Sequence, residues 1–286
     1  MGAPPEIGGM IGGRYRLRRM LAAGGMGTVY EAEDAEHGER VAIKLLHSEL
    51  ARDEEVHRRF RREASILGAL EHPAVVRVRD GGTDASGIVY TVMELLEGET
   101  LRARIQRGPS TPAELAPVVE DLCEGLDAAH HHGVVHGDLK PANVFLLEGA
   151  RMDVTAKIVD FGLSKVHGLE RLTRTGEVMG TPQYMAPELL TGESAVDRRA
   201  DVYGLGVLVF EALAGRPPFT ERNPGRLLFQ VARGEAPALE DLRPDVPPAV
   251  AGVVRRAMSP QPGGRPEDAP SFGRLFARAL REGAAQ

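Results

Sequence analysis

Residues 136–143 read His-Gly-Asp-Leu-Lys-Pro-Ala-Asn, which places a carboxylate, an ammonium group and an amide in one short segment. Asp138 can accept the proton of an attacking hydroxyl, and Lys140 can neutralise charge on a transferred phosphoryl group. Asn143 can bind a magnesium ion through its side-chain oxygen. Phosphoryl transfer depends mainly on positioning and electrostatic stabilisation, so these groups suit that chemistry. The same residue types also crowd ordinary surface loops, so the segment needs support from the rest of the chain.

The composition is that of an ordinary globular protein. The chain has 286 residues, of which 42% are hydrophobic and 27% charged, and these numbers fit one large domain or two lobes. A net charge of -6 disfavours partners such as nucleic acid or an anionic membrane. The single cysteine, Cys123, excludes an internal disulfide framework and is expected in the core of a cytoplasmic protein. The longest apolar run, residues 202–215, is too short for a membrane segment, and we find no secretory signal.

The first part of the chain is predicted to form a small antiparallel sheet. Residues 1–13 are rich in Gly and Pro without periodicity, so we expect a flexible tail there. A strand over 14–21, the segment Ala-Ala-Gly-Gly-Met-Gly over 22–27 and an alternating strand over 28–33 predict a glycine-rich hairpin. Glycines in such a turn let backbone N–H groups approach phosphate oxygens, although a plain turn is the simpler interpretation of this segment taken alone.

A third strand, residues 41–45, carries Lys44 on the face opposite its large apolar residues. Lys44 can hold phosphate oxygens, or it can be a solvated lysine at a sheet edge. A helix is expected next, on which Glu63 shares a broad face with apolar residues and either pairs with Lys44 or lies on the surface. Two more strands are expected over 75–79 and 88–94.

The spacing of apolar residues changes at Gly98, and we predict a lobe boundary there. After this residue the spacing is helical. Three consecutive histidines, residues 130–132, suggest a metal site at first sight. Neighbouring residues on a helix point in different directions, however, so a helix end before Gly133 is the better interpretation. Short apolar runs at 144–147 and 156–159 predict a hairpin, and Asp160 follows it directly as a second oxygen ligand for magnesium.

Taken in order, these motifs resemble a eukaryotic-type protein kinase catalytic domain, and specifically the bacterial serine/threonine kinases. The resemblance runs from about residue 15 to residue 280. Besides the glycine-rich turn, Val-Ala-Ile-Lys, Glu63 and the 138–143 loop, it rests on Asp-Phe-Gly at 160–162. Later motifs are Gly-Thr-Pro-Gln-Tyr-Met-Ala-Pro-Glu at 180–188, Asp-Val-Tyr-Gly-Leu-Gly at 201–206, and Arg265.

The resemblance implies an α+β, two-lobed protein-kinase-like fold that forms one catalytic domain. Its N-lobe, residues 14–97, would be a five-stranded antiparallel sheet with one main helix, and its C-lobe, residues 98–286, would be mostly helical. The domain would use ATP and Mg²⁺, with Mn²⁺ as a substitute. It would phosphorylate Ser/Thr hydroxyls of protein substrates and of itself, and a homodimer is left open.

The resemblance also assigns roles to single residues. Asp138 would be the catalytic base, with Lys140, a Lys44–Glu63 ion pair and Thr181 completing the catalytic set, and Asn143 and Asp160 would bind the metal. Asp201 would brace the catalytic loop, Glu188 and Arg265 would form a buried ion pair, and His136, Phe161, Leu67 and Val78 would stack as an apolar spine. The nucleotide would be held by Ala22, Ala23, Gly24, Gly25, Met26, Gly27, Val29, Ala42, Lys44, Met93, Glu94, Leu96 and Phe145.

Two positions depart from the family pattern. Ala22 stands where the first glycine of the turn is usual, and we expect little effect because alanine accepts an extended backbone. Gly137 stands where most protein kinases carry the arginine that contacts a phosphorylated loop residue. Thr173 and Thr175 resemble the autophosphorylated Thr-x-Thr pair of bacterial kinases. We therefore expect phosphate at one of them, with a weak effect on activity.

Two alternative functions stay open at the level of sequence. His-Gly-Asp is also typical of small-molecule phosphotransferases such as aminoglycoside kinases, but those enzymes lack the 180–188 segment, Asp-Phe-Gly and Arg265 as a set. A pseudokinase scaffold would bind partners without catalysis, but the presence of Lys44, Asp138, Asn143 and Asp160 argues against it.

Overall fold

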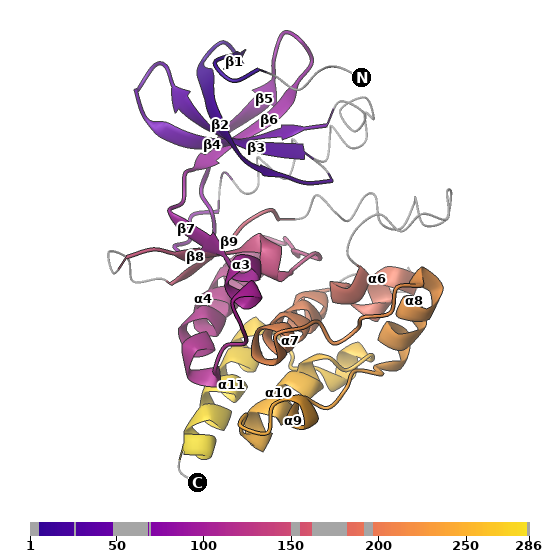
Figure 1. The fold of residues 1–286 in the computed structure, drawn as a ribbon. Helices are drawn as coiled ribbons and strands as arrows, with labels where there is room; N and C mark the ends of the chain where they lie inside the picture. The colour runs from indigo at the N-terminus through magenta and orange to yellow at the C-terminus, as the bar shows by residue number, and fades with distance from the viewer. Residues whose placement is uncertain are drawn as a thin grey trace. The chain divides into compact units, whose positions relative to one another are not determined.

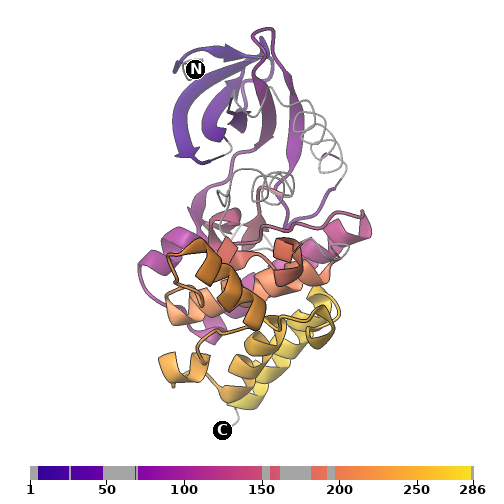
Figure 2. The same cartoon turned by 90° about the vertical axis from the view of Figure 1, so that its right-hand side faces the viewer.

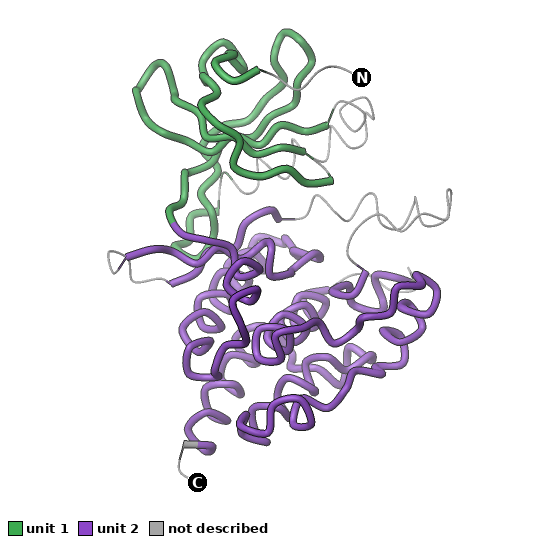
Figure 3. The backbone as a smooth tube through the Cα atoms, viewed as in Figure 1, with its two compact units in different colours: residues 1–97 green, residues 98–286 purple. Residues whose placement is uncertain are grey.

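The computed structural model describes residues 6–25, 27–47, 68, 70–149, 155–161, 182–191 and 197–284. The chain divides into two compact units, residues 1–97 and residues 98–286, which Figure 3 distinguishes by colour. The first unit contains the predicted sheet, and the second contains most of the helices.

Unit 1 is built on an antiparallel sheet whose strands follow the order β1-β2-β3-β4-β6-β5 (Figure 1). Alternating apolar residues of these strands bury one face in a cluster that includes Leu17, Tyr30, Ile43 and Val92, and this burial is the main stabilising term for such a sheet. The strands are β1 (Met10–Ile11), β2 (Tyr15–Ala23), β3 (Gly27–Asp34), β4 (Arg40–Leu46), β5 (Val78–Thr83) and β6 (Val89–Glu94).

Strand β1 comes from the segment that we expected to be a flexible tail. Residues 6–13 instead fold back along β2, where the Gly8 N–H donates to the Leu17 carbonyl at 2.8 Å. Ile11 is buried in the apolar cluster of unit 1, and Gly12 turns the chain with a φ of +61°. A Cβ at Gly12 would lie 2.4 Å from the Tyr90 hydroxyl, so the turn requires glycine. Of the two residues of β1, only Ile11 is buried. A single apolar residue produces no periodic pattern, so the strand could not be predicted from the sequence.

One predicted strand is displaced along the chain. The apolar run at 75–79 was expected to be a strand, but β5 begins only at Val78. Val75 and Val76 are buried, so their apolar character reflects packing of a connecting segment rather than a place in the sheet. The other predicted strands of unit 1 are confirmed with small changes at their ends.

Unit 2 is mostly helical, as predicted, and α7 (Arg199–Ala214) is its central helix. Every residue of α7 from Ala200 to Leu213 is buried, and α4, α10 and α11 pack around it, with α11 beside α10 in both views (Figure 2). In the described part of the chain, no helix is long and apolar enough to cross a membrane. The other helices are α3 (Leu101–Gln106), α4 (Pro112–His131), α6 (Pro187–Thr191), α8 (Pro224–Arg233), α9 (Leu239–Leu242), α10 (Pro248–Ala257) and α11 (Ala269–Ala284).

Local sequence explains both ends of α4. At its start, the Thr111 hydroxyl accepts from the Glu114 N–H while the Glu114 carboxylate accepts from the Thr111 N–H, which is a capping box. At its end, Gly133 adopts a φ of +71°, which stops the helix after the histidines as predicted. Cys123 is buried on this helix, as expected, and burial raises the pKa of its thiol to about 12.

A small sheet of three strands, β7 (Gly98–Thr100), β8 (Val144–Leu147) and β9 (Ala156–Ile158), completes the described core of unit 2. Strands β8 and β9 pair antiparallel, so the hairpin predicted after the catalytic stretch is confirmed.

The predicted ion pair between Glu188 and Arg265 is also confirmed, with N–O distances of 2.6 and 2.8 Å. The Arg265 side chain is fully buried and donates further bonds to the carbonyls of Ser259 and Pro260. A buried guanidinium with this many acceptors ties the start of α6 to the segment that follows α10.

Candidate active site

In unit 1, the glycine-rich turn joins β2 to β3 as the predicted hairpin. The Gly24 N–H donates to the Gly27 carbonyl at 2.9 Å and closes the turn. A Cβ at Gly27 would lie 2.2 Å from the Leu45 carbonyl oxygen, so only glycine fits there, whereas a Cβ at Gly25 would meet nothing within 4 Å. Gly27 is therefore needed for strand packing, and Gly24 and Gly25 leave the tip of the turn open for a ligand to approach the backbone. Ala22 and Ala23 lie opposite Val29 and Thr28 on the ladder.

Lys44 lies on β4, in the middle of the sheet rather than at its edge. It stands opposite Val29 on one side and Thr91 on the other, and it is buried. The interpretation as a solvated edge lysine is therefore wrong. Ala42 stands opposite Met93, and both are buried.

At the end of β6, Glu94 is fixed by reciprocal bonds with Arg77. The Glu94 N–H donates to the Arg77 carbonyl at 3.0 Å, and the Glu94 carboxylate accepts from the Arg77 N–H at 2.8 Å. Leu96 follows just before the end of unit 1. Glu94 and Leu96, two of the predicted nucleotide-binding residues, thus lie at and just after the end of β6, the strand that pairs with the strand of Lys44.

In unit 2, the structure brings Asp138, Lys140 and Asn143 together. Lys140 Nζ donates to Asp138 Oδ2 at 2.5 Å, and Asn143 Nδ2 donates to the Asp138 carbonyl at 2.9 Å. Asp138 is buried, and its other carboxylate oxygen, Oδ1, has no hydrogen-bond partner. A buried carboxylate oxygen without a donor is costly, so Oδ1 is a ready acceptor for a hydroxyl proton.

Asp201, at the start of α7, braces this loop as predicted. Its carboxylate accepts the backbone N–H of His136 at 2.8 Å and that of Gly137 at 2.7 Å, and His130 Nε2 lies 2.7 Å from its Oδ2. Burial by itself raises the pKa of Asp201, but these hydrogen bonds outweigh burial and hold its pKa below the ordinary range. Asp201 is therefore a carboxylate that anchors the two residues preceding Asp138.

His136 connects the loop to the strand that leads to Asp160. Its ring packs on Phe161 with centroids 4.8 Å apart, its Nδ1 lies 3.2 Å from the Asp138 N–H, and its Nε2 faces the Val159 carbonyl at 3.3 Å. Complete burial lowers the pKa of His136. The imidazole is thus neutral, with Nδ1 as acceptor and Nε2–H as donor. The part of the predicted spine in unit 2 is in contact, whereas Val78 lies on β5 of unit 1.

Strand pairing places the backbone of Asn143 beside the segment that leads to Asp160. Asn143 immediately precedes β8, Asp160 follows β9, and the Val159 N–H donates to the Asn143 carbonyl at 2.9 Å. Among the non-glycine residues that the structure describes, only Asp160 has a positive φ, at +58°. Strained backbone of this kind concentrates at functional sites. Phe145 lies on β8 opposite Lys157.

Sequence reasoning missed the residue that anchors β9. Asp121 on α4 accepts from the Thr155 N–H, the Thr155 hydroxyl and the Ala156 N–H at 2.6, 2.7 and 2.9 Å. The only signal in the sequence was an aspartate among the apolar residues of that helix. Glu63, Leu67, Met26, Thr181, Thr173 and Thr175 lie outside the described residues.

The family model described as protein kinase domain matches residues 15–258 of the chain. The chain belongs to the protein kinase domain family. Serine/threonine-protein kinase pkn2 of Myxococcus xanthus is 38% identical over 282 residues, which cover 97% of this chain and 33% of that protein. Serine/threonine-protein kinase PknH of Mycobacterium tuberculosis is 38% identical over 258 residues, covering 90% of this chain and 40% of PknH. This kinase domain therefore corresponds to well under half the length of these relatives.

The predicted fold class is confirmed by solved structures, although the sheet of unit 1 has six described strands rather than the predicted five, because β1 joins it. The kinase domain of Mycobacterium tuberculosis PknI superposes with a TM-score of 0.79 at 29% identity, covering 97% of this chain and all of that one. Protein kinases in general use ATP with Mg²⁺. The residues present fit these groups, because Asn143 and Asp160 supply the hard oxygen ligands that magnesium prefers and Asp138 Oδ1 lacks a partner.

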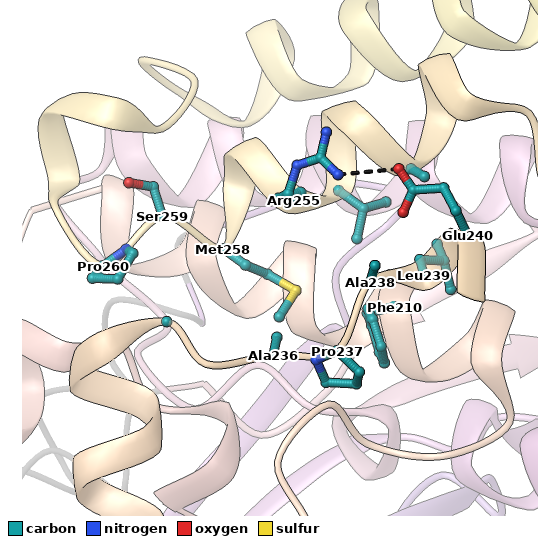
Figure 4. Close-up of a pocket in the computed structure, with 13 residues that line it drawn as sticks. Phe210, Ala236, Pro237, Ala238, Leu239, Glu240, Arg255, Met258, Ser259 and Pro260 are labelled. Carbon is teal, nitrogen blue, oxygen red and sulfur yellow. Dashed lines mark hydrogen bonds and ion pairs between the residues drawn. The ribbon is translucent and has the colours of Figure 1, made fainter. Parts of the chain in front are cut away.

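Unit 2 also has a cavity of about 350 Å³, which is lined by residues of α7, α9, α10 and neighbouring segments (Figure 4). Its walls are mostly apolar and include Phe210, Leu239 and Met258, while Glu240 and Arg255 form an ion pair at 3.0 Å on its wall. No predicted site residue is among the described residues that line it. Among the described residues, the cavity and the predicted phosphoryl-transfer site therefore share no member.

Proposed function

We propose that this kinase domain is an ATP-dependent protein serine/threonine kinase, which transfers the γ-phosphoryl group of ATP to Ser/Thr hydroxyls of proteins, including its own. The observation that carries the proposal is the arrangement at Asp138, where Lys140 and Asn143 hold one carboxylate oxygen and the backbone while Oδ1 has no partner. The names of the relatives support the choice of Ser/Thr hydroxyls.

In the proposed mechanism, the Asp138 carboxylate accepts the hydroxyl proton of the substrate through Oδ1. Lys140 holds Oδ2 and provides positive charge where negative charge develops on the transferred phosphoryl group. Asn143 and Asp160 would hold Mg²⁺, and the ion would neutralise charge on the phosphates. Lys44 and the glycine-rich turn would orient the phosphates, and the ion pair of Lys44 with Glu63 stays a prediction from the sequence.

Lys140 also indicates which kind of substrate hydroxyl is phosphorylated. The segment Asp-Leu-Lys-Pro-Ala-Asn resembles serine/threonine kinases rather than tyrosine kinases. A short aliphatic hydroxyl brings the phosphoryl group within reach of Lys140, whereas a phenol arrives from further out. No observation favours a small-molecule phosphotransferase, and the Glu188–Arg265 ion pair supports the assignment to protein kinases. A cytoplasmic location and a homodimer stay predictions from the sequence.

Control by loop phosphorylation is proposed to be weak. Gly137 has no side chain to receive a phosphate at Thr173 or Thr175, and one charge-assisted contact of this kind is worth about 1.5–3 kcal/mol. Replacing both threonines by alanine should therefore lower kcat/KM by less than about fivefold, which is under roughly 1 kcal/mol. A loss near a hundredfold would mean that another cation receives the phosphate.

The direct test of the function is phosphate transfer to a protein or peptide, followed by mass spectrometry, with Asp138→Asn as the variant. The amide cannot accept the proton, so kcat should fall by about two to four orders of magnitude with nearly unchanged nucleotide binding. Asp245→Asn is the matched control, because it alters an exposed carboxylate that pairs with Arg243 far from the catalytic loop in sequence and should leave kcat unchanged. Parental activity in Asp138→Asn would remove Asp138 from the role of base.

A further inference from the structure

Helix α4 packs against β9 and buries an aspartate there. Asp121 is 8% exposed, whereas its neighbour Glu120 is exposed to solvent. The three hydrogen bonds to its Oδ2 come from two consecutive residues, Thr155 and Ala156, at 2.6, 2.7 and 2.9 Å. A carboxylate is costly to bury, and hydrogen bonds to a charged acceptor are about twice as strong as neutral ones. Asp121 thus holds the chain at the point where β9 begins.

We propose that Asp121 is a positioning residue for the predicted metal ligand Asp160, and that it acts by fixing the register of β9. The proposal rests on the proposed kinase function. Strand β9 ends at Ile158, so Asp160 follows it almost directly. The backbone of Asp160 has a φ of +58°, a conformation that persists in a non-glycine residue only when the surrounding structure imposes it. The strand that leads into Asp160 must therefore be held firmly from outside.

The pairing of β8 with β9 does not fix the register of β9 by itself. It consists of three residue pairs, and eight residues, 148–155, separate the two strands. A short hairpin loop sets the register through its turn geometry, whereas a connection of this length leaves the register open. All three residues of β9 are buried, so an alternation of buried and exposed positions does not set the register either. Asp121 supplies the missing reference point from a regular helix.

The two predicted metal ligands are held by different elements. Asn143 Nδ2 donates to the Asp138 carbonyl within the catalytic loop, whereas Asp160 depends on β9. The two segments are joined by the bond from the Val159 N–H to the Asn143 carbonyl at 2.9 Å. A slip of one residue in β9 would displace Asp160 by about 3.3 Å along the strand. Because metal–ligand distances tolerate only about 0.2 Å, loss of Asp121 should weaken metal binding even where β9 still forms.

The test measures metal binding rather than activity. Calorimetric titration of the full chain with a non-hydrolysable ATP analogue, in Mn²⁺ and in EDTA, gives the gain in nucleotide affinity that the metal provides. Asp121→Ala should reduce this gain about ten- to a hundredfold, as expected when a group that orients a metal ligand is lost, while affinity in EDTA stays within about twofold of the parent. Asp121→Asn keeps one oxygen as acceptor and should lose about three- to tenfold. Glu124→Ala is the matched control and should behave as the parent, because Glu124 is exposed on the same helix.

Hydrogen exchange at the Val159 amide reports on β9 in the absence of nucleotide and metal. The Val207 amide, in the middle of α7, serves as the reference for global unfolding. In Asp121→Ala, the protection of Val159 should fall at least about tenfold more than that of Val207, because loss of the anchor opens β9 locally. A general loss of stability would lower the protection of both amides equally.

Two outcomes would overturn the proposal. One is a metal-dependent gain in Asp121→Ala within about twofold of the parental gain. The other is an equal fall in protection at Val159 and Val207, together with a loss of metal affinity that follows the melting temperature, which would show a purely structural role. If Asp121→Ala does not fold, Asp121→Asn decides by the same two measurements. A parent that gains affinity from Mn²⁺ but transfers no phosphate would refute the kinase function and leave the role of Asp121 standing, whereas a parent without any such gain would refute that role.

Discussion

Gly137 offers a sharp test of how the catalytic loop is held. It lies between His136 and Asp138 with a φ of +70°, and its N–H donates to Asp201 Oδ1 at 2.7 Å. If the backbone left the left-handed region, the Gly137 N–H would lose this acceptor. Gly137→Ala therefore asks whether the loop conformation is imposed by Asp201 or adopted freely.

The expected effect on stability follows from two opposing terms. An L-residue in the left-handed region costs about 1–2 kcal/mol. Alanine also restricts the unfolded chain, which offsets about 0.4–1 kcal/mol of that cost. The net loss should be about 0.5–1.5 kcal/mol, or a melting temperature lower by about 1–4 °C.

Gly133→Ala is the matched control for this strain. Gly133 has nearly the same φ, +71°, and a Cβ there would meet no atom within 4 Å. Both variants should therefore lose similar stability in urea denaturation. Only Gly137→Ala should also lose activity, by about tenfold or more, because its strain shifts the residue that carries the base.

Two results would refute this reasoning. If Gly137→Ala keeps parental stability while Gly133→Ala does not, the loop relaxes away from its φ and Asp201 does not impose it. If both variants lose stability equally and also retain equal kcat, the backbone at Gly137 does not control the position of Asp138.

Three further predictions concern buried ionisable groups. Glu188→Ala leaves the Arg265 charge buried without its partner and should destabilise the fold by about 3–5 kcal/mol in urea titration; Glu267→Ala, at an exposed ion pair, should cost under about 1 kcal/mol. Burial raises the pKa of the Glu211 carboxyl above its value in the unfolded chain. The free-energy cost of burying its charge is therefore absent at pH 4, where the buried carboxyl is protonated, and this cost grows as the pH rises through the folded pKa. Glu211→Gln should therefore gain stability relative to the parent at pH 8 and not at pH 4, and an equal effect at both values would contradict this. Burial lowers the pKa of His136, so the parent should lose stability as pH falls below about 6.5 toward that lowered pKa. In the His136→Phe variant, the melting temperature should fall less than in the parent as the pH drops below about 6.5.

The sequence by itself determined the local elements and the order of the motifs. Alternation predicted the strands on either side of the glycine-rich turn, and the residue pattern after Gly98 predicted the helices of unit 2. The motif Asp138 to Asn143 predicted the residues that the structure brings together in one loop. Such features depend on neighbouring residues, so periodicity and spacing carry them.

Only the tertiary structure decided how these elements are held. His130 and Asp201 are 71 positions apart, and nothing in either local sequence links them. The same holds for Asp121 with Thr155, and for the burial of Ile11 that turns the expected tail into β1. The charge states of Asp201 and His136 also required the fold, because burial and hydrogen bonds shift their pKa values. These properties depend on distances through space, which a chain acquires only when its distant segments pack together.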